Sequence, residues 1–249
     1  MIKKISIVLL VLLLGCDSES GWDCLKKEGV LIREEIALDT FEKIRNGRGV
    51  RLVIQQGEVQ KVELETGENI REDVKIFVEN GVLITEELSS CNFFRPYEVT
   101  TVYVTSPNLT EIRNDSPFTV ESNGVLRYDK LSLISENASD PNSDYTNGDF
   151  HLELEVNQLQ VVSNNISNFY ISGTAQKASV GLYSGDSRFE GKNLIVQELS
   201  VYQRSSNKMF VHPIQSIKGE IRGLGDVIAY HQPPVVEVME YYTGRLIFR

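Results

Sequence analysis

The sequence predicts an all-β protein built as a right-handed parallel β-helix, a solenoid, with some hairpins in its N-terminal half. Short β-type segments follow one another at even spacing from Phe150 to Tyr230. Asn, Ser and Gly separate them, and no helical period of apolar residues appears. Most segments are too short to be stable alone, so each is expected to lie beside its neighbours in a repeating array. An antiparallel β-sandwich is the alternative.

The array consists of short segments whose centres lie roughly seven to ten residues apart. They are LELEV (152–156), LQVV (159–162), FYIS (169–172), ASVGLY (178–183), SRFEG (187–191), LIVQELSVY (194–202), MFV (209–211), SIKGEI (216–221) and DVIAY (226–230). Three segments are expected to complete one coil. Left-handed backbone conformations at the corners are expected at Asn164, Asn165, Asn168, Gly173, Gly181, Gly185 and Gly191. A sandwich would keep using two-residue hairpins, and these become scarce after Gly124.

The N-terminal half predicts alternating strands with tighter turns. The strands are expected over Thr40–Arg45, Val50–Gln55, Val59–Thr66, Val74–Glu79, Val82–Glu87 and Thr100–Thr105. Asn80-Gly81 predicts a two-residue hairpin, because both positions tolerate a positive φ. Asn123-Gly124 predicts another tight turn. Residues 25–36 fit either a helical turn or a first strand.

The first fifteen residues have the pattern of a secretory signal. Lys3 and Lys4 precede an apolar run, Ile5 to Leu14, that is too short to anchor in a bilayer. The run ends in Leu-Leu-Gly-Cys16, which resembles the lipobox of bacterial lipoproteins; a chance Gly-Cys after an ordinary signal is the alternative. The resemblance implies cleavage before Cys16 and acylation of its thiol, with outer-membrane lipid as a partner. We therefore expect a signal peptide over 1–15, a lipidated tether over 16–36 and one β-helix domain over 37–249.

The net charge of −10 restricts the partners. Removing residues 1–15, which carry two lysines and no acid, leaves −12. Such an acidic chain argues against nucleic acid, since phosphate binding needs clustered Lys and Arg. Cys24 and Cys91 are either paired in a disulfide, which an oxidising compartment permits, or two free thiols.

Three runs carry a resemblance to a known family. They are FEKIRNGRGVRLVIQQGEVQKVELETGENI (41–70), VKIFVENGVLITEE (74–87) and VTTVYVTSPNLTEIRN (99–114). They resemble the GIN domain, described as an auto-transporter adhesin head, and the segment 216–249 is similar to the family's end. The likeness covers roughly 37–249 and departs at HQPPVVEVMEYY, where the family commonly has Gly before its Pro. It implies a β-helix-like fold on a surface or periplasmic protein, with no catalytic residues to carry over.

Catalytic chemistry is not expected, and neither is a cofactor. His151, His212 and His231 are few and accompany no nucleophile motif. β-Helix enzymes that cleave acidic polysaccharides resemble this architecture, and they need a Lys or Arg base with a row of Asp on one face. The acids of the array alternate with apolar residues and are expected to point to solvent; they are Glu153, Glu155, Glu190 and Glu198.

One loop has the spacing of a calcium site. Asp140, Asn142 and Asp144 stand at i, i+2 and i+4, as in a calcium loop. Tyr145 replaces the Gly of that motif, and His151 stands where its bidentate Glu belongs. The segment 140–149 is therefore either a weak calcium site or an acidic loop without a metal.

A second loop is aromatic and does not alternate as a strand would. Phe93, Phe94 and Tyr97 are candidates for binding a ligand. The alternative is that this loop plugs one end of the solenoid, and plugging is favoured because an open solenoid end must be capped.

The sequence thus predicts a lipid-anchored envelope lipoprotein of the outer membrane, on its periplasmic face or at the cell surface. Its expected role is non-enzymatic and adhesin-like, with a glycan or another envelope protein as ligand. A polysaccharide-active β-helix enzyme and a structural envelope lipoprotein are the alternatives.

Overall fold

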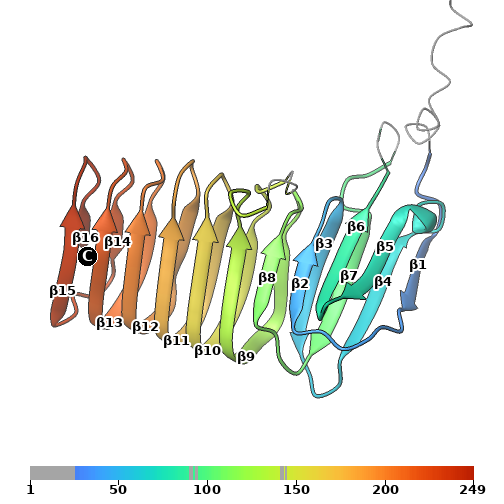
Figure 1. Cartoon of the computed structure of the whole chain (residues 1–249), viewed down its shortest axis with the longest axis horizontal. Helices are drawn as coiled ribbons and strands as arrows, with labels where there is room; N and C mark the ends of the chain where they lie inside the picture. The colour runs from blue at the N-terminus through green and yellow to red at the C-terminus, as the bar shows by residue number, and fades with distance from the viewer. Residues whose placement is uncertain (1–25, 90–91, 93–94, 141–142, 144) are drawn as a thin grey trace, which may run out of the picture.

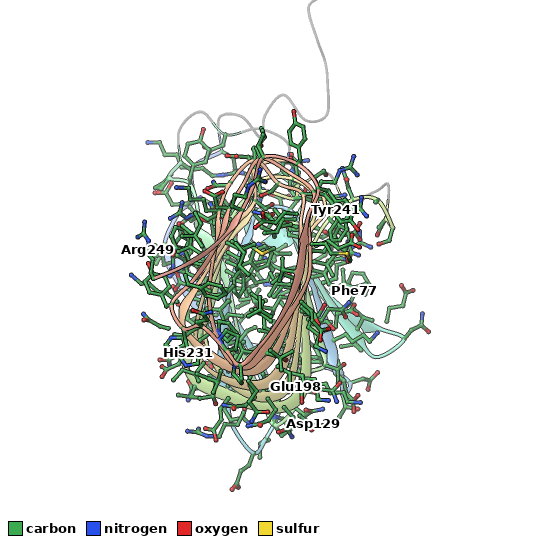
Figure 2. The ribbon with its side chains drawn as sticks, turned by 90° about the vertical axis from the view of Figure 1, so that its left-hand side faces the viewer. Phe77, Asp129, Glu198, His231, Tyr241 and Arg249 are labelled. Atoms are coloured by element: carbon green, nitrogen blue, oxygen red, sulfur yellow. The ribbon has the colours of Figure 1, made fainter. Side chains whose placement is uncertain are left out.

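The computed structural model describes residues 26–89, 92, 95–140, 143 and 145–249. These residues form a flattened solenoid whose coils stack along the long axis of the molecule (Figure 1). An end-on view shows two faces with side chains packed between them, and Asp129, Glu198 and Arg249 on the outside (Figure 2). In this part of the chain, no helix has the length and apolar character that a membrane span requires.

Strands make up nearly all of the regular structure. Those of the N-terminal half are β1 (Leu31–Glu35), β2 (Lys43–Asn46), β3 (Val50–Gln56), β4 (Lys61–Gly67), β5 (Val74–Glu79), β6 (Val82–Glu87), β7 (Thr100–Ser106) and β8 (Glu111–Asn114). Those of the C-terminal half are β9 (Val120–Ser135), β10 (Phe150–Ser163), β11 (Asn168–Leu182), β12 (Arg188–Gln203), β13 (Met209–Ile221), β14 (Val227–Ala229), β15 (Val235–Glu240) and β16 (Leu246–Phe248). One 3-10 turn, η2 (Arg71–Asp73), precedes β5.

The predicted parallel β-helix is confirmed. Strands β9 to β13 pair in parallel, each with the next. The register steps from Phe150 to Phe169 and on to Phe189, so these coils span 19 and 20 residues. Inward apolar residues therefore stack on one another from coil to coil. The β-sandwich alternative is wrong, because its sheets would be antiparallel.

Each long strand bends and contributes to both faces. In β10 the side chains alternate between inside and outside up to Val156, and then Asn157 and Gln158 are both exposed. Two consecutive outward residues mark the bend, after which Leu159 resumes the alternation. LELEV and LQVV are thus two halves of one strand, and the same holds for the next pairs of segments. A coil contains two predicted segments, so the expectation of three was wrong.

The N-terminal half adds antiparallel pairs at one end of the solenoid. The hairpin at Asn80-Gly81 is confirmed, since β5 and β6 pair antiparallel and the two residues have φ of 51° and 75°. Residues 31–35 form a strand, β1, which pairs antiparallel with β4. Asn123-Gly124 makes no hairpin. It lies inside β9 opposite a register shift in β10, where Gly124 adopts a φ of 85°.

The corners use fewer left-handed residues than expected. Of the seven positions predicted, only Gly173 and Gly185 have a positive φ. The asparagines act through their side chains instead. Asn165 donates to the Thr146 hydroxyl at 2.7 Å, and Asn168 donates to the Asp149 carboxylate at 3.1 Å. The corner expectation is therefore corrected: amide hydrogen bonds between coils satisfy the turns.

One edge of the interior is polar and is followed by the loops. Buried hydroxyls and amides pair at the ends of successive strands: Asn46 with Asn114 at 2.9 Å, Ser135 with Ser167 at 2.6 Å, and Ser163 with Ser187 at 2.7 Å. Each pairing satisfies groups that would be costly to bury alone. The ladder fixes the edge from which the long loops leave.

Candidate functional site

Two long loops leave this edge and border one pocket of about 310 Å³. One follows β6 and contributes Ser89, Asn92 and residues 95–99, and the other follows β9 and contributes Tyr145. We call the cavity the loop pocket. Its principal side chains are Arg48, Glu87, Arg95, Tyr97, Phe118 and Tyr145.

The floor of the loop pocket is a buried carboxylate. The side chain of Glu87, at the end of β6, is 10% exposed. Its Oε2 accepts from the Thr100 hydroxyl at 2.6 Å, and its Oε1 accepts from Ser89 and from Arg95 Nη2, the latter at 3.1 Å. A buried charge is tolerated only with such partners. Glu87 is consequently held as a fixed structural anion.

Arg95 is the buried cation of the pocket. Its side chain is 5% exposed, and its Nη2 donates to Glu87 and Ser89. The backbone N–H of Arg95 donates to Asn92 Oδ1 at 3.0 Å. Nη1 is buried as well, and among the described residues it has no hydrogen-bond partner. The guanidinium is thus only half satisfied.

A glycine turn brings a second arginine to the pocket. Gly49 has a φ of 77°, and a Cβ added there would lie 2.8 Å from the Cβ of Glu87. Glycine alone fits both the conformation and the space. The turn lets the Arg48 carbonyl accept from the N–H of Glu87 at 2.8 Å, and Arg48 Nη2 donates to the Ser89 carbonyl at 3.2 Å. Arg48 itself stays exposed.

Aromatic rings form the rim. Tyr97 is 79% exposed, while Phe118 and Tyr145 are half-buried. Beside Tyr97, Glu98 has a φ of 61°, which is uncommon for a residue with a side chain and clusters at functional sites. The plug interpretation is wrong for Tyr97, because its ring is exposed and the N-terminal end is covered by β1, β4 and β5 (Figure 1).

Tyr97 also borders a second cavity, of about 340 Å³. Its opposite wall is the beginning of the described chain, Glu28, Gly29 and Leu31. The chain therefore enters the fold next to the loop pocket.

The second loop is fixed at its start by Glu136. This carboxylate accepts from Arg113 Nη2 at 2.8 Å and from the backbone N–H of Ala138 and Ser139 at 2.7 and 3.0 Å. Burial alone would raise the pKa of Glu136, but the hydrogen bonds from Ser139, Arg113 and Ala138 outweigh it and lower the pKa to about 2. The loop that carries Tyr145 thus begins from a rigid anchor.

The predicted calcium loop is partly outside the described residues. Asn142 and Asp144 belong to that part. The Asp140 carboxylate lies 2.8 Å from Arg45 Nη2, and Arg45 also donates to Asp115 at 2.8 Å. Among the residues that the structure covers, no group of three or more His, Cys, Asp or Glu side chains is arranged to hold a metal ion. Calcium binding by this loop remains a prediction.

Other predicted positions also fall outside the described residues. They are the lipidation site Cys16, the disulfide candidates Cys24 and Cys91, and the aromatic candidates Phe93 and Phe94. Tyr97 is the one aromatic candidate that can be placed. Together with Tyr145 it shows that the two loops suspected from the sequence border the same pocket.

In the part of the chain that the structure describes, the histidines do not converge on a nucleophile. His151 lies against Tyr170 with ring centroids 4.4 Å apart, and His212 lies 6.2 Å from His231. The predicted outward acids point outward: Glu153, Glu155 and Glu198 are exposed and Glu190 is half-buried.

A shallow polar trough of about 360 Å³ crosses the second halves of β9 to β12. Its charged side chains are Lys130, Lys177 and Glu198, and its centre is made of small residues such as Ser179 and Ser200. Lys177 lies 3.4 Å from Glu198. The trough contains no Asp side chain, so it lacks the row of aspartates that the polysaccharide-enzyme alternative requires.

Sequence reasoning missed four residues of the loop pocket: Arg48, Glu87, Arg95 and Phe118. Arg48 follows an Asn-Gly pair in the sequence, and that pair signalled a turn rather than a site. Glu87 ends an alternating strand and resembled a solvated acid. A signal that could have been used is Arg95, a charged residue inside an otherwise apolar loop.

The comparisons with known proteins agree on the fold. Residues 40–233 match the family described as "Putative auto-transporter adhesin, head GIN domain". No curated protein matches the chain in sequence.

Among solved structures, one described as a putative adhesin from Bacteroides fragilis is similar, with a TM-score of 0.80 and 19% identity over 90% of this chain and 99% of that one. A putative adhesin from Parabacteroides merdae has a TM-score of 0.59 and 17% identity, over 90% and 99% of the two chains. A protein from Parabacteroides distasonis described as a putative lipid-binding protein has 0.57 and 14%, over 88% and 97%. At these identities the likeness concerns the fold alone.

Proposed function

This chain belongs to the adhesin-head GIN domain family, and we propose that it is a non-enzymatic binding module held at the cell envelope by a lipid on Cys16. The loop pocket is its binding site, and the ligand is a glycan or another envelope component. The observation that carries the proposal is the buried, half-satisfied guanidinium of Arg95 under an exposed aromatic rim. Ligand pockets commonly combine an apolar lining with a few fixed polar groups.

Support for the lipid comes from the sequence. A basic start, a short apolar run and Gly15-Cys16 occur together, as they do at lipoprotein signal cleavage sites. Two or more acyl chains would give stable anchoring, where a single chain would be marginal.

The anchor is tested by expressing the full chain and partitioning it between detergent and aqueous phases. The wild type is expected in the detergent phase, and Cys16→Ala in the aqueous phase. Cys24→Ala is the matched control, because it removes a nearby thiol that does not follow the apolar run. Partitioning of Cys16→Ala with the wild type would refute the anchor.

The binding role draws support from rigidity. The solenoid stacks 19- and 20-residue coils in register, and both pocket loops leave its polar edge. Sites built on rigid supports lose less entropy when a ligand binds. Glu87 and Glu136 hold the starts of the two loops through buried hydrogen bonds.

The binding role is tested with the full chain in mild detergent, on a glycan array and in pull-downs from envelope fractions. A ligand is expected that loses at least tenfold in affinity on Tyr97→Ala, in line with the weight of aromatic residues in binding sites. Tyr170→Ala, which removes an exposed ring from β11, should leave binding unchanged. A chain that retains no ligand in either assay is not a binding module.

A further inference from the structure

We propose that the loop pocket recognises a carboxylate-bearing sugar, such as a uronic or sialic acid, through the guanidinium groups of Arg48 and Arg95. This inference rests on the proposed function and specifies the ligand class of the same site. It starts from a buried polar group of the pocket that has no hydrogen-bond partner among the described residues.

That group is Arg95 Nη1. Among the described residues, only two buried side-chain nitrogen or oxygen atoms lack a hydrogen-bond partner, Arg95 Nη1 and the Tyr128 hydroxyl. Tyr128 faces the core, whereas Arg95 lines the loop pocket. A buried donor without a partner destabilises the folded protein, and more so if it is charged. A ligand that supplies an acceptor at this position would remove the cost.

The acceptor is expected to be a carboxylate because of the charges around it. Glu87 already accepts from three donors and balances Arg95. Arg48 is a second cation at the same wall, and its side chain donates to the backbone carbonyl of Ser89. The forked guanidinium matches a carboxylate in geometry and keeps its charge at any physiological pH. The guanidinium N–H groups of Arg48 and Arg95 that these acceptors do not occupy therefore suit one anionic group.

The remaining lining suits a saturated ring. Tyr97, Phe118 and Tyr145 offer ring surfaces, and Pro96 and Pro117 add apolar surface without backbone donors. Tyrosine provides a large, rigid contact area at a low entropy cost. The volume of about 310 Å³ is at the lower end of the range for ligand pockets. A terminal sugar acid fits this combination better than an extended peptide, which would need a long groove.

One charge of the pocket opposes the ligand. Glu98 is exposed and borders both the loop pocket and the cavity on the other side of Tyr97. Because the negative charge of Glu98 repels an anionic ligand, neutralising Glu98 should strengthen binding of an anion and leave binding of a neutral sugar unchanged.

The affinity of the full chain for each probe is measured by calorimetric titration in mild detergent. The probes are trigalacturonic acid and sialyllactose, each compared with its methyl ester, which keeps the sugar rings, adds one small methyl group at each carboxyl and removes the charge. At least one free acid is expected to bind roughly tenfold more tightly than its ester, the effect of one charge-assisted hydrogen bond. The preference should weaken as salt is added.

Three variants locate the effect. Arg48→Gln should remove most of the preference for the acid, and Glu98→Gln should raise affinity for the acid about two- to fivefold. Arg127→Gln is the matched control, because it removes an exposed arginine of β9 outside the loop pocket and should change nothing. Equal binding of acid and ester, or a preference untouched by Arg48→Gln, overturns the inference.

The inference and the proposed function fail separately. If neither sugar acid binds but another glycan or an acidic peptide depends on Tyr97, the carboxylate sugar is wrong and the binding module stands. If no ligand of any class is retained, both are wrong.

Discussion

The phenyl ring of Phe150 stacks on that of Phe169 with centroids 4.8 Å apart and planes 8° apart, and the two residues are direct partners in parallel register. Phe189 continues the column in the next coil. All three are buried, so the column ties successive coils together through their interior. Stacked coils gain their stability largely from such contacts between neighbours.

Removing the central ring should be costly. Phe169→Ala is expected to lower the free energy of unfolding by about 3–5 kcal/mol, because it opens a cavity that two coils share. Denaturant unfolding followed by circular dichroism measures the loss. Thr174→Ala, on the outer side of the same strand, should stay within about 0.5 kcal/mol. A loss below about 1 kcal/mol for Phe169→Ala would mean that the coils are not coupled through this column.

The Arg95–Glu87 pair should behave as a coupled unit. Arg95→Leu is expected to lower the free energy of unfolding by about 3–5 kcal/mol, since it leaves the Glu87 carboxylate buried without its cation. Adding Glu87→Gln should restore at least half of that loss. Arg127→Gln breaks an exposed ion pair and should cost less than about 1 kcal/mol. Strictly additive effects of the two pocket substitutions would contradict the coupling.

Tyr128→Phe should stabilise the protein. The Tyr128 hydroxyl is buried in β9 and has no partner among the described residues, and burial raises the pKa of this phenol. Removing an unpaired buried hydroxyl is expected to raise the free energy of unfolding by about 1 kcal/mol. Thermal unfolding of the two proteins side by side checks this. A lower melting temperature for the variant would show that the hydroxyl has a partner, such as a buried water.

The Glu136 carboxylate should make stability depend on pH. Its folded pKa of about 2 lies below its ordinary value of 4.5, so the folded state binds this proton less readily than the unfolded chain. The stabilisation is therefore complete above about pH 4.5 and is lost as the pH falls toward 2. The shift corresponds to roughly 3 kcal/mol.

The test compares wild type and Glu136→Gln in denaturant titrations between pH 7 and pH 2. The difference in free energy of unfolding should be large at pH 7 and shrink below pH 4. A difference that stays constant over this range would rule out the titration of Glu136 as its source.

The fold could be predicted because its signals are local. Alternation of apolar residues and the pair Asn80-Gly81 report on neighbours in the chain, and these features were placed correctly. Asn123-Gly124 carries the same letters and yet sits inside β9. Its neighbouring segments pair with β10 and β3 instead of with each other, and no local signal contains that choice.

The candidate site could be predicted only in outline. The two loops at 93–97 and 140–149 stood out by composition, and the structure places Tyr97 and Tyr145 around one pocket. The partnership of Arg48, Glu87 and Arg95 depends on which coil edge each residue reaches. These positions follow from the strand register and from the space that Gly49 leaves, and neither can be predicted from the spacing of residues along the chain.

The entry of the chain beside Tyr97 limits how far the pocket can travel. Glu28 borders the cavity next to Tyr97, and an anchor at Cys16 would lie twelve residues upstream. Even if it were fully extended, this twelve-residue connection would span at most about 40 Å. The pocket would then sample a thin layer above its own membrane, whereas the far end of the solenoid would be free to swing outward. With a lipid on Cys16, the pocket would therefore reach ligands at the surface of its own cell, and it would not reach ligands on a distant surface.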